Sequence, residues 1–88
     1  MKIEDTLETR ETVYGSFFGV SCIAQDLKAV MRSTDNWAGL SPDQQESLEM
    51  IANKVARVLN GDPDFFDSWH DIAGYATLIA MRLGDFES

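Results

Sequence analysis

Residues 41–61 read SPDQQESLEMIANKVARVLNG, a stretch that contains the signals for both the start and the end of a helix. Ser41 is a favoured N-cap residue, Pro42 suits the first helical position, and Gln44 completes a capping box. The final glycine is the residue type that most often follows the end of a helix. The stretch therefore predicts one long helix that ends at Asn60.

Two more helices and a polar arm are predicted around this helix. Apolar residues recur at helical spacing from about 16 to 32, which predicts a helix before it. A turn leads into a third helix from about 65 to 83, again followed by a glycine. Residues 1–15 form a polar, acidic arm that predicts at most a short helix. We expect one all-α domain over residues 1–88, a small bundle of three main helices that is completed by oligomerisation.

Composition and charge narrow the class of protein. A chain of 88 residues with 44% hydrophobic residues should fold as one domain, although it buries only about 60–65% of its unfolded surface. The net charge of −8 opposes binding to a nucleic-acid backbone. Cys22 is the one cysteine, so neither an internal disulfide nor a thiolate metal site is expected. Because no apolar run approaches membrane-spanning length, we expect a soluble, cytoplasmic protein.

The second and third predicted helices each have one apolar stripe. In the second helix it consists of Leu48, Ile51, Val55, Val58 and Leu59. Glu46, Glu49, Asn53 and Arg57 fall on the opposite side of that helix. In the third helix the stripe consists of Phe65, Trp69, Ile72, Ala76, Ile79 and Leu83. Ordinary packing of a helical core accounts for both stripes.

The opposite face of the third helix is unusual because it mixes acids with apolar residues. It carries Asp67, His70, Asp71, Gly74, Leu78 and Met81. A solvated face would not need Leu78 or Met81, and Gly74 costs a helix about 1 kcal/mol relative to Ala. We therefore expect packing on both sides of this helix, with Gly74 allowing a close backbone approach. The second side would pack either inside a four-helix arrangement or across a subunit interface, and we expect a homo-oligomer.

Four carboxylates at helical spacings form a candidate metal site: Glu46, Glu49, Asp67 and Asp71. Oxygen ligands of this kind suit Mg²⁺, which binds more tightly when substrate phosphates complete its shell. Lys54 and Arg57, one or two turns further on, are candidates to meet phosphate oxygens. The alternative is a solvated acidic face, because 15 acids in the chain make such spacings common. Spacing alone favours this alternative by about two to one.

Tyr14 is the candidate to stack on a nucleobase. It precedes Gly15, and Phe17 and Phe18 follow. The alternative is that these aromatic residues form a hydrophobic plug at the start of a helix. His70 is the single histidine and is expected to be a hydrogen-bonded structural residue. No phosphate-binding glycine loop, nucleophile elbow or HExxH motif is present.

Three segments together resemble a family of small phage and prophage proteins of unassigned function. They are TVYGSF at 12–17, SLEMIANKVARVLNGDP at 47–63 and DSWHDIAGYATL at 67–78. More distantly, ESLE at 46–49 followed by SWHDIAGYATL resembles the MazG-like all-α nucleotide pyrophosphohydrolases. Those enzymes use the acids of an ExxE and an ExxD motif to hold Mg²⁺. The resemblance places Glu46, Glu49 and Asp71 on this pattern, with Ser68 where a Glu would stand and Asp67 beside it.

The resemblance implies a MazG-like helical hairpin and a connection with nucleotides. We expect a phage or prophage protein that binds a nucleotide; whether it also performs Mg²⁺-dependent hydrolysis of nucleoside triphosphates is left open by the incomplete acidic motif. The first alternative is a non-catalytic interaction protein that inhibits a host defence system or a host enzyme through its acidic surface. The second alternative is a purely structural helical module.

Overall fold

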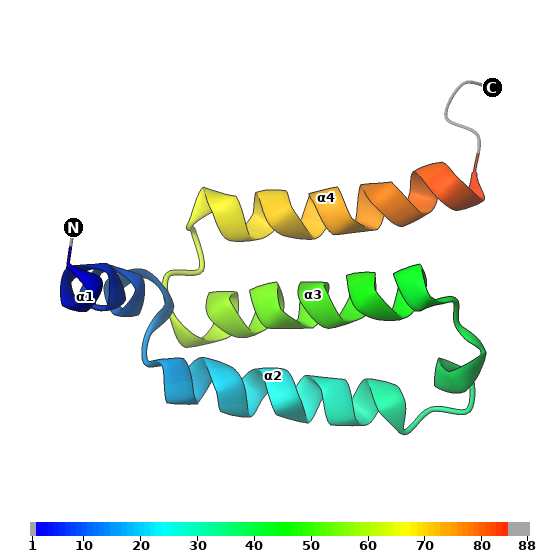
Figure 1. The fold of residues 1–88 in the computed structure, drawn as a ribbon, viewed down its shortest axis with the longest axis horizontal. Helices are drawn as coiled ribbons and strands as arrows, with labels where there is room; N and C mark the ends of the chain where they lie inside the picture. Colours follow the sequence, from blue (N-terminus) through cyan, green and yellow to red (C-terminus); the bar gives the residue numbers. More distant parts are fainter. Residues whose placement is uncertain (1, 85–88) are drawn as a thin grey trace.

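Four α-helices account for most of the chain (Figure 1). The computed structural model describes residues 2–84, and its elements are α1 (Ile3–Tyr14), α2 (Phe17–Arg32), a short 3₁₀ helix η1 (Trp37–Gly39), α3 (Pro42–Asn60) and α4 (Phe66–Leu83). Over these residues there is no strand, so the predicted all-α class is confirmed. Within the same residues, every helix is too short or too polar to cross a membrane.

The boundaries of the three main helices follow their local signals. Ser41 is the N-cap of α3, and its backbone N–H donates to Gln44 Oε1 at 3.0 Å, as the capping box predicts. Ser16 is the N-cap of α2 and accepts a hydrogen bond from the backbone N–H of Gly19 at 3.0 Å. The polar arm is more ordered than predicted, since α1 runs for 12 residues with two acids in its first turn. Acids at this position interact favourably with the helix dipole.

The helices α2, α3 and α4 form a single layer with α3 in the middle (Figure 1). The helix α1 lies at one end of the layer, against α2 and α3. Within residues 2–84 the buried residues are all small: Ala24, Ala52, Ala56, Ser47 and Ser68. Small side chains allow the helix axes to approach closely. Several larger apolar side chains stay exposed, among them Leu48 at 40%, Trp69 at 54% and Leu59 at 64%.

Polar contacts join the neighbouring helices. Ser47 Oγ donates to the carbonyl oxygen of Tyr75 at 3.3 Å, which ties α3 to α4. At the other end of α4, Arg82 forms an ion pair with Asp43 of α3. Hydrogen bonds from Ser41 and Arg82 hold the pKa of the Asp43 carboxyl below its ordinary value. This carboxylate therefore stays ionised, and its pairing with Arg82 persists, under mildly acidic conditions.

A tight corner between α1 and α2 is fastened to the end of α3. Asn60 Nδ2 donates to the carbonyl oxygens of Tyr14 at 3.0 Å and Ser16 at 3.1 Å. Gly15 has φ of +79° and ψ of −168°, a conformation that is essentially restricted to glycine. A Cβ atom on Gly15 would lie 2.3 Å from the carbonyl oxygen of Asn60. The corner therefore requires a glycine for both its backbone conformation and its close contact.

The surroundings of Gly74 differ from those of Gly15 and from those that the sequence predicted. It lies exposed on α4, and a Cβ added there would meet nothing within 4 Å. The predicted close backbone approach at Gly74 is therefore absent within a single chain. From the sequence alone, Gly15 and Gly74 look alike, because each only interrupts or flanks a helical pattern. The structure shows that a close contact requires the first but not the second.

We predict opposite effects for alanine at these two glycines. Gly15→Ala should lower the free energy of unfolding by at least about 2 kcal/mol, because the strained backbone and the contact with Asn60 act together. Gly74→Ala should raise it by up to about 1 kcal/mol, because alanine is the better helix former and the site is open. Urea denaturation of both variants beside the wild type measures the difference. A destabilising Gly74→Ala would contradict the open site and indicate a close contact there.

Candidate functional site

The four acids of the predicted metal site share one side of the layer. By helical position, Glu46 and Glu49 of α3 and Asp67 and Asp71 of α4 face away from the aliphatic stripes of their helices. The Glu49 carboxylate forms an ion pair with Arg32 of α2, whose Nη2 lies 2.7 Å from Oε2. This ion pair joins α2 to α3.

The two acids of α4 differ in their surroundings. Asp71 Oδ2 lies 3.1 Å from Lys54 Nζ of α3, and only 12% of that lysine side chain is exposed. Asp67 is exposed and, among residues 2–84, has no hydrogen-bond or ion-pair partner. Lys54 was predicted to meet phosphate oxygens, but in the structure it neutralises Asp71. Because most of the lysine side chain is buried, this ion pair holds Lys54 against α4.

These positions do not fit a Mg²⁺ ion within one chain. In the described part of the chain, no three His, Cys, Asp or Glu side chains lie close enough together to hold a metal. Mg²⁺ requires oxygen ligands at about 2.0–2.1 Å, whereas two of the four acids already bind cationic side chains. The Mg²⁺ site therefore remains a prediction from spacing and resemblance, and we derive no chemical step from it.

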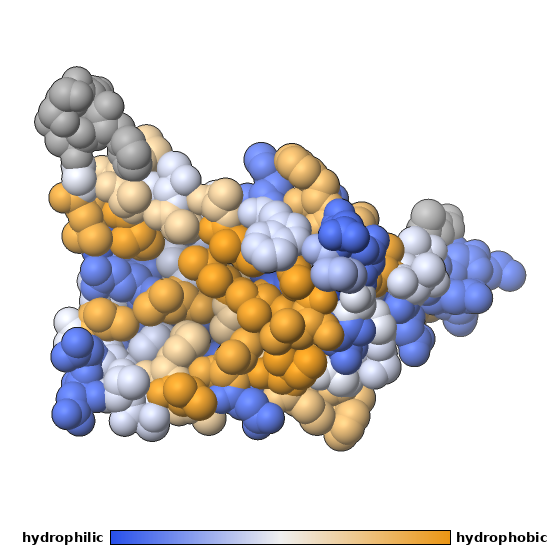
Figure 2. Space-filling view, turned by 180° about the vertical axis from the view of Figure 1, so that it is seen from behind, coloured by the Kyte–Doolittle hydropathy of each residue, from blue (hydrophilic) through white to orange (hydrophobic). Residues whose placement is uncertain are grey.

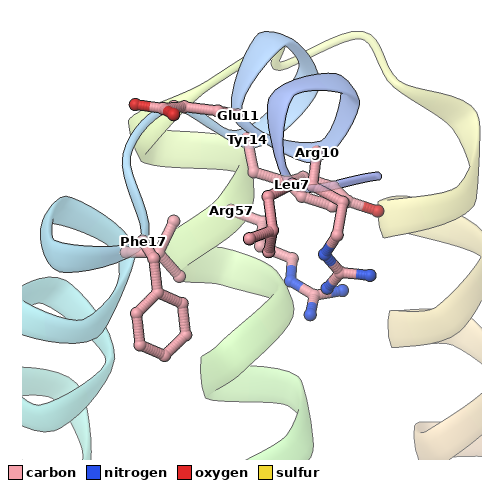
Figure 3. Close-up of a pocket in the computed structure, with 8 residues that line it drawn as sticks. Leu7, Arg10, Glu11, Tyr14, Phe17 and Arg57 are labelled. Atoms are coloured by element: carbon pink, nitrogen blue, oxygen red, sulfur yellow. The ribbon is translucent and has the colours of Figure 1, made fainter. Parts of the chain in front are cut away.

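Another site lies where α1 crosses the end of the layer. A pocket of about 300 Å³ opens there, and it is lined by Leu7, Arg10, Glu11, Tyr14, Gly15, Phe17, Val20 and Arg57 (Figure 3). These residues come from α1, from the start of α2 and from the last turns of α3. Two of the three predicted nucleotide-binding residues, Tyr14 and Arg57, are thus brought together. Lys54 is not among the residues that line this pocket.

Two arginines contact the same aromatic ring in this pocket. The Cζ atom of Arg57 lies 4.5 Å from the centroid of the Tyr14 ring, and that of Arg10 lies 5.5 Å from it. Figure 3 shows both guanidinium groups directed to the same side of Tyr14, with the Glu11 carboxylate directed away from them. Within residues 2–84, neither guanidinium forms a hydrogen bond or an ion pair. Two cations without acid partners thus lie together in a chain of net charge −8.

Local structure explains this arrangement. Arg10 and Tyr14 are four residues apart on α1, so their side chains share one face of that helix. The rings of Tyr14 and Phe65 also pack in a T-shaped contact, with ring centroids 5.8 Å apart. Arg10 was not predicted, although its spacing from Tyr14 could have indicated it once the arm was taken as helical.

The structure changes the expected role of Tyr14. This residue was the candidate to stack on a base, but its ring is half-buried and is contacted by Arg57. Phe17 also lines the pocket and is 85% exposed, and its ring makes no aromatic contact within residues 2–84. Tyr14 therefore contacts the guanidinium groups, whereas the Phe17 ring is largely exposed at the pocket.

His70 lies outside this pocket. Its ring stacks on Phe66 of the same helix, with centroids 5.3 Å apart and planes 22° apart. The residue is exposed, and the described residues offer it no hydrogen bond. The predicted structural role is supported by the ring contact, but the predicted hydrogen bond is absent.

Comparisons with known proteins give one short similarity. The chain is 36% identical over 59 residues to the probable β-galactosidase C of Aspergillus fumigatus and to that of Neosartorya fischeri. The matched part is 60% of this chain, and the chain spans 6% of the length of these curated relatives. No protein-family model matches the chain. No solved structure matches it.

We predict that Asp71 stabilises the fold and that Asp67 does not. Asp71→Asn should lower the free energy of unfolding by about 1 kcal/mol, because Lys54 would lose the charge that compensates its ammonium group. Asp67→Asn, the matched control on the same side of α4, should change it by less than about 0.5 kcal/mol. Urea denaturation without divalent ions measures both values.

The same variants test the metal site. If Mg²⁺ raises the melting temperature of the wild type and both substitutions abolish that increase, the two acids share a metal. That result would contradict the separate placement of Asp67 and Asp71.

Proposed function

We propose that the protein binds a nucleotide through the pocket between α1, α2 and α3. The observation that carries this proposal is the pair of guanidinium groups, Arg10 and Arg57, held without acid partners against one side of Tyr14. Guanidinium groups donate paired hydrogen bonds to phosphate oxygens, and two of them can bind a di- or triphosphate. A phosphate chain would also offset the repulsion between the two neighbouring cations.

The rest of the pocket suits the other half of a nucleotide. Leu7, Val20 and the exposed ring of Phe17 form an apolar wall beside the arginines. Stacking of a base on an aromatic ring contributes about 1–3 kcal/mol and depends little on the identity of the base. We therefore propose phosphates on Arg10 and Arg57 and a base on Phe17.

The proposal is one of binding rather than of catalysis. The pocket contains a single carboxylate, that of Glu11, and the four acids of the hydrolase motif lie elsewhere. A β-galactosidase needs two carboxyl groups on either side of the glycosidic bond, so the similarity to the fungal proteins supports no glycosidase proposal here. The resemblance to MazG-like enzymes supports the nucleotide. Phage origin and pyrophosphohydrolysis remain predictions from that resemblance.

Calorimetric titration with a nucleoside triphosphate in EDTA tests the proposal. We expect binding without Mg²⁺, and we expect Arg10→Gln and Arg57→Gln each to weaken it about 10-fold, since each removes a charged hydrogen-bond donor. Phe17→Ala should weaken binding of the nucleoside triphosphate but not of inorganic tripolyphosphate. Arg32→Gln is the matched control, because that guanidinium binds Glu49 outside the pocket.

Three outcomes decide between the alternatives. Equal losses in all the arginine variants would indicate nonspecific attraction of an anion. Binding that appears only with Mg²⁺ and survives both pocket substitutions would favour the acidic motif. No heat with any nucleotide or tripolyphosphate, on folded protein, would favour the non-catalytic interaction protein.

A further inference from the structure

The aliphatic stripes of α3 and α4 lie on the same side of the layer and form one continuous surface. A groove of about 280 Å³ between the two helices shows this, since Leu48 and Ile51 of α3 and Ala76 and Ile79 of α4 line it together. Leu59 and Trp69 lie on the same side by helical position. We call these six residues the apolar face. Figure 2 shows this side of the molecule, where apolar side chains cover a broad area of the layer.

The apolar face is open to solvent and has no charged side chain. Leu59 is 64% exposed and Trp69 is 54% exposed, although both are large apolar side chains. By helical position, the charged residues of α3 and α4 project from other sides of their helices: Asp43, Glu46, Glu49, Lys54, Arg57, Asp67, Asp71 and Arg82. An exposed apolar area of this kind marks an interaction surface.

The accessible surface area of the chain is larger than its mass predicts for a compact monomer. A compact monomer of this mass exposes about 5,200 Å², roughly 1,100 Å² less than the 6298 Å² of this chain. Its radius of gyration is 15.1 Å, against about 12 Å for a compact chain of this length. A stable dimer buries about 800 Å² on each partner. The surplus surface is therefore sufficient for one such interface.

We propose that a second copy of this chain covers the apolar face, so that two three-helix layers pack face to face around a twofold axis. Twofold pairing is the commonest form of self-association, and stacking two helical layers is a standard way to bury an apolar side. Two chains of net charge −8 repel each other, but a face without charged groups keeps those charges away from the contact. A different protein would find no charged group on this face that could make its binding specific.

This interface differs from the one that the sequence predicted. Gly74, Leu78 and Met81 were expected to meet another copy, but they lie on the opposite side of α4, near Asp67 and Asp71. Because the nucleotide pocket uses Arg57, which also projects away from the apolar face, both surfaces can be occupied at once. The dimer therefore does not depend on the proposed nucleotide site.

Sedimentation equilibrium of the full chain tests the dimer. At about 10 µM we expect twice the chain mass of 9.8 kDa. Leu59→Glu should raise the dissociation constant at least about 100-fold, because the twofold axis places two carboxylates in a desolvated contact. Leu78→Glu is a matched control at 62% exposure on the other side, and it should leave the dimer intact. The far-UV circular dichroism of each variant reports its helix content.

A second measurement needs no variant. The urea midpoint of the wild type should rise with protein concentration, because dissociation then accompanies unfolding. A wild-type monomer at about 100 µM overturns the proposal, as does a midpoint that is independent of concentration. Dissociation by Leu78→Glu with retention by Leu59→Glu would place the contact on the opposite side and also overturn it.

Discussion

Close contact through alanine and serine is the constraint from which the rest of this structure follows. Ala52, Ala56 and Ser47 allow α3 to lie against both neighbours at once, and Ala24 and Ser68 complete those contacts. Because the buried residues are all small, larger apolar side chains such as Leu59 and Trp69 stay exposed at the surface of the layer. Along α3 and α4 one side is aliphatic, and the other carries the charged groups together with Leu78 and Met81. The aliphatic surface is thereby separated from the charged groups.

The candidate ligand site depends on a different feature, the corner that joins α1 to α2. Asn60 holds this corner against the end of α3, and Gly15 allows the backbone to turn there. As a consequence, the last turn of α1 lies beside Arg57, and Tyr14 becomes the surface on which two arginines rest. The pocket therefore forms from residues that are far apart in the sequence, and its geometry comes from backbone contacts rather than from a phosphate-binding loop.

The sequence predicted the helices better than the contacts between their charged side chains. Helix periodicity and caps such as Ser41 are local properties, so the bounds of α2, α3 and α4 were recognisable. Periodicity also showed which side of a helix Asp71 occupies, but not that Lys54 would reach it from a neighbouring helix. Arg10 was missed because it lies in an arm that was expected to form at most a short helix. Pairing of charges depends on how helices are set side by side, and no single helix contains that information.

The three ion pairs between helices also shape the electrostatic field of the molecule. Arg32, Lys54 and Arg82 are three of the seven basic residues of the chain, and each is neutralised by an acid on an adjacent helix. Arg10 and Arg57 are thereby left without acid partners among the described residues, and they lie together against Tyr14. Because the chain carries 15 acids against 7 basic residues, its overall field repels anions, and these two guanidinium groups can attract one only at short range. A long polyanion would meet repulsion along most of its length, whereas a small anion that enters the pocket would contact both guanidinium groups.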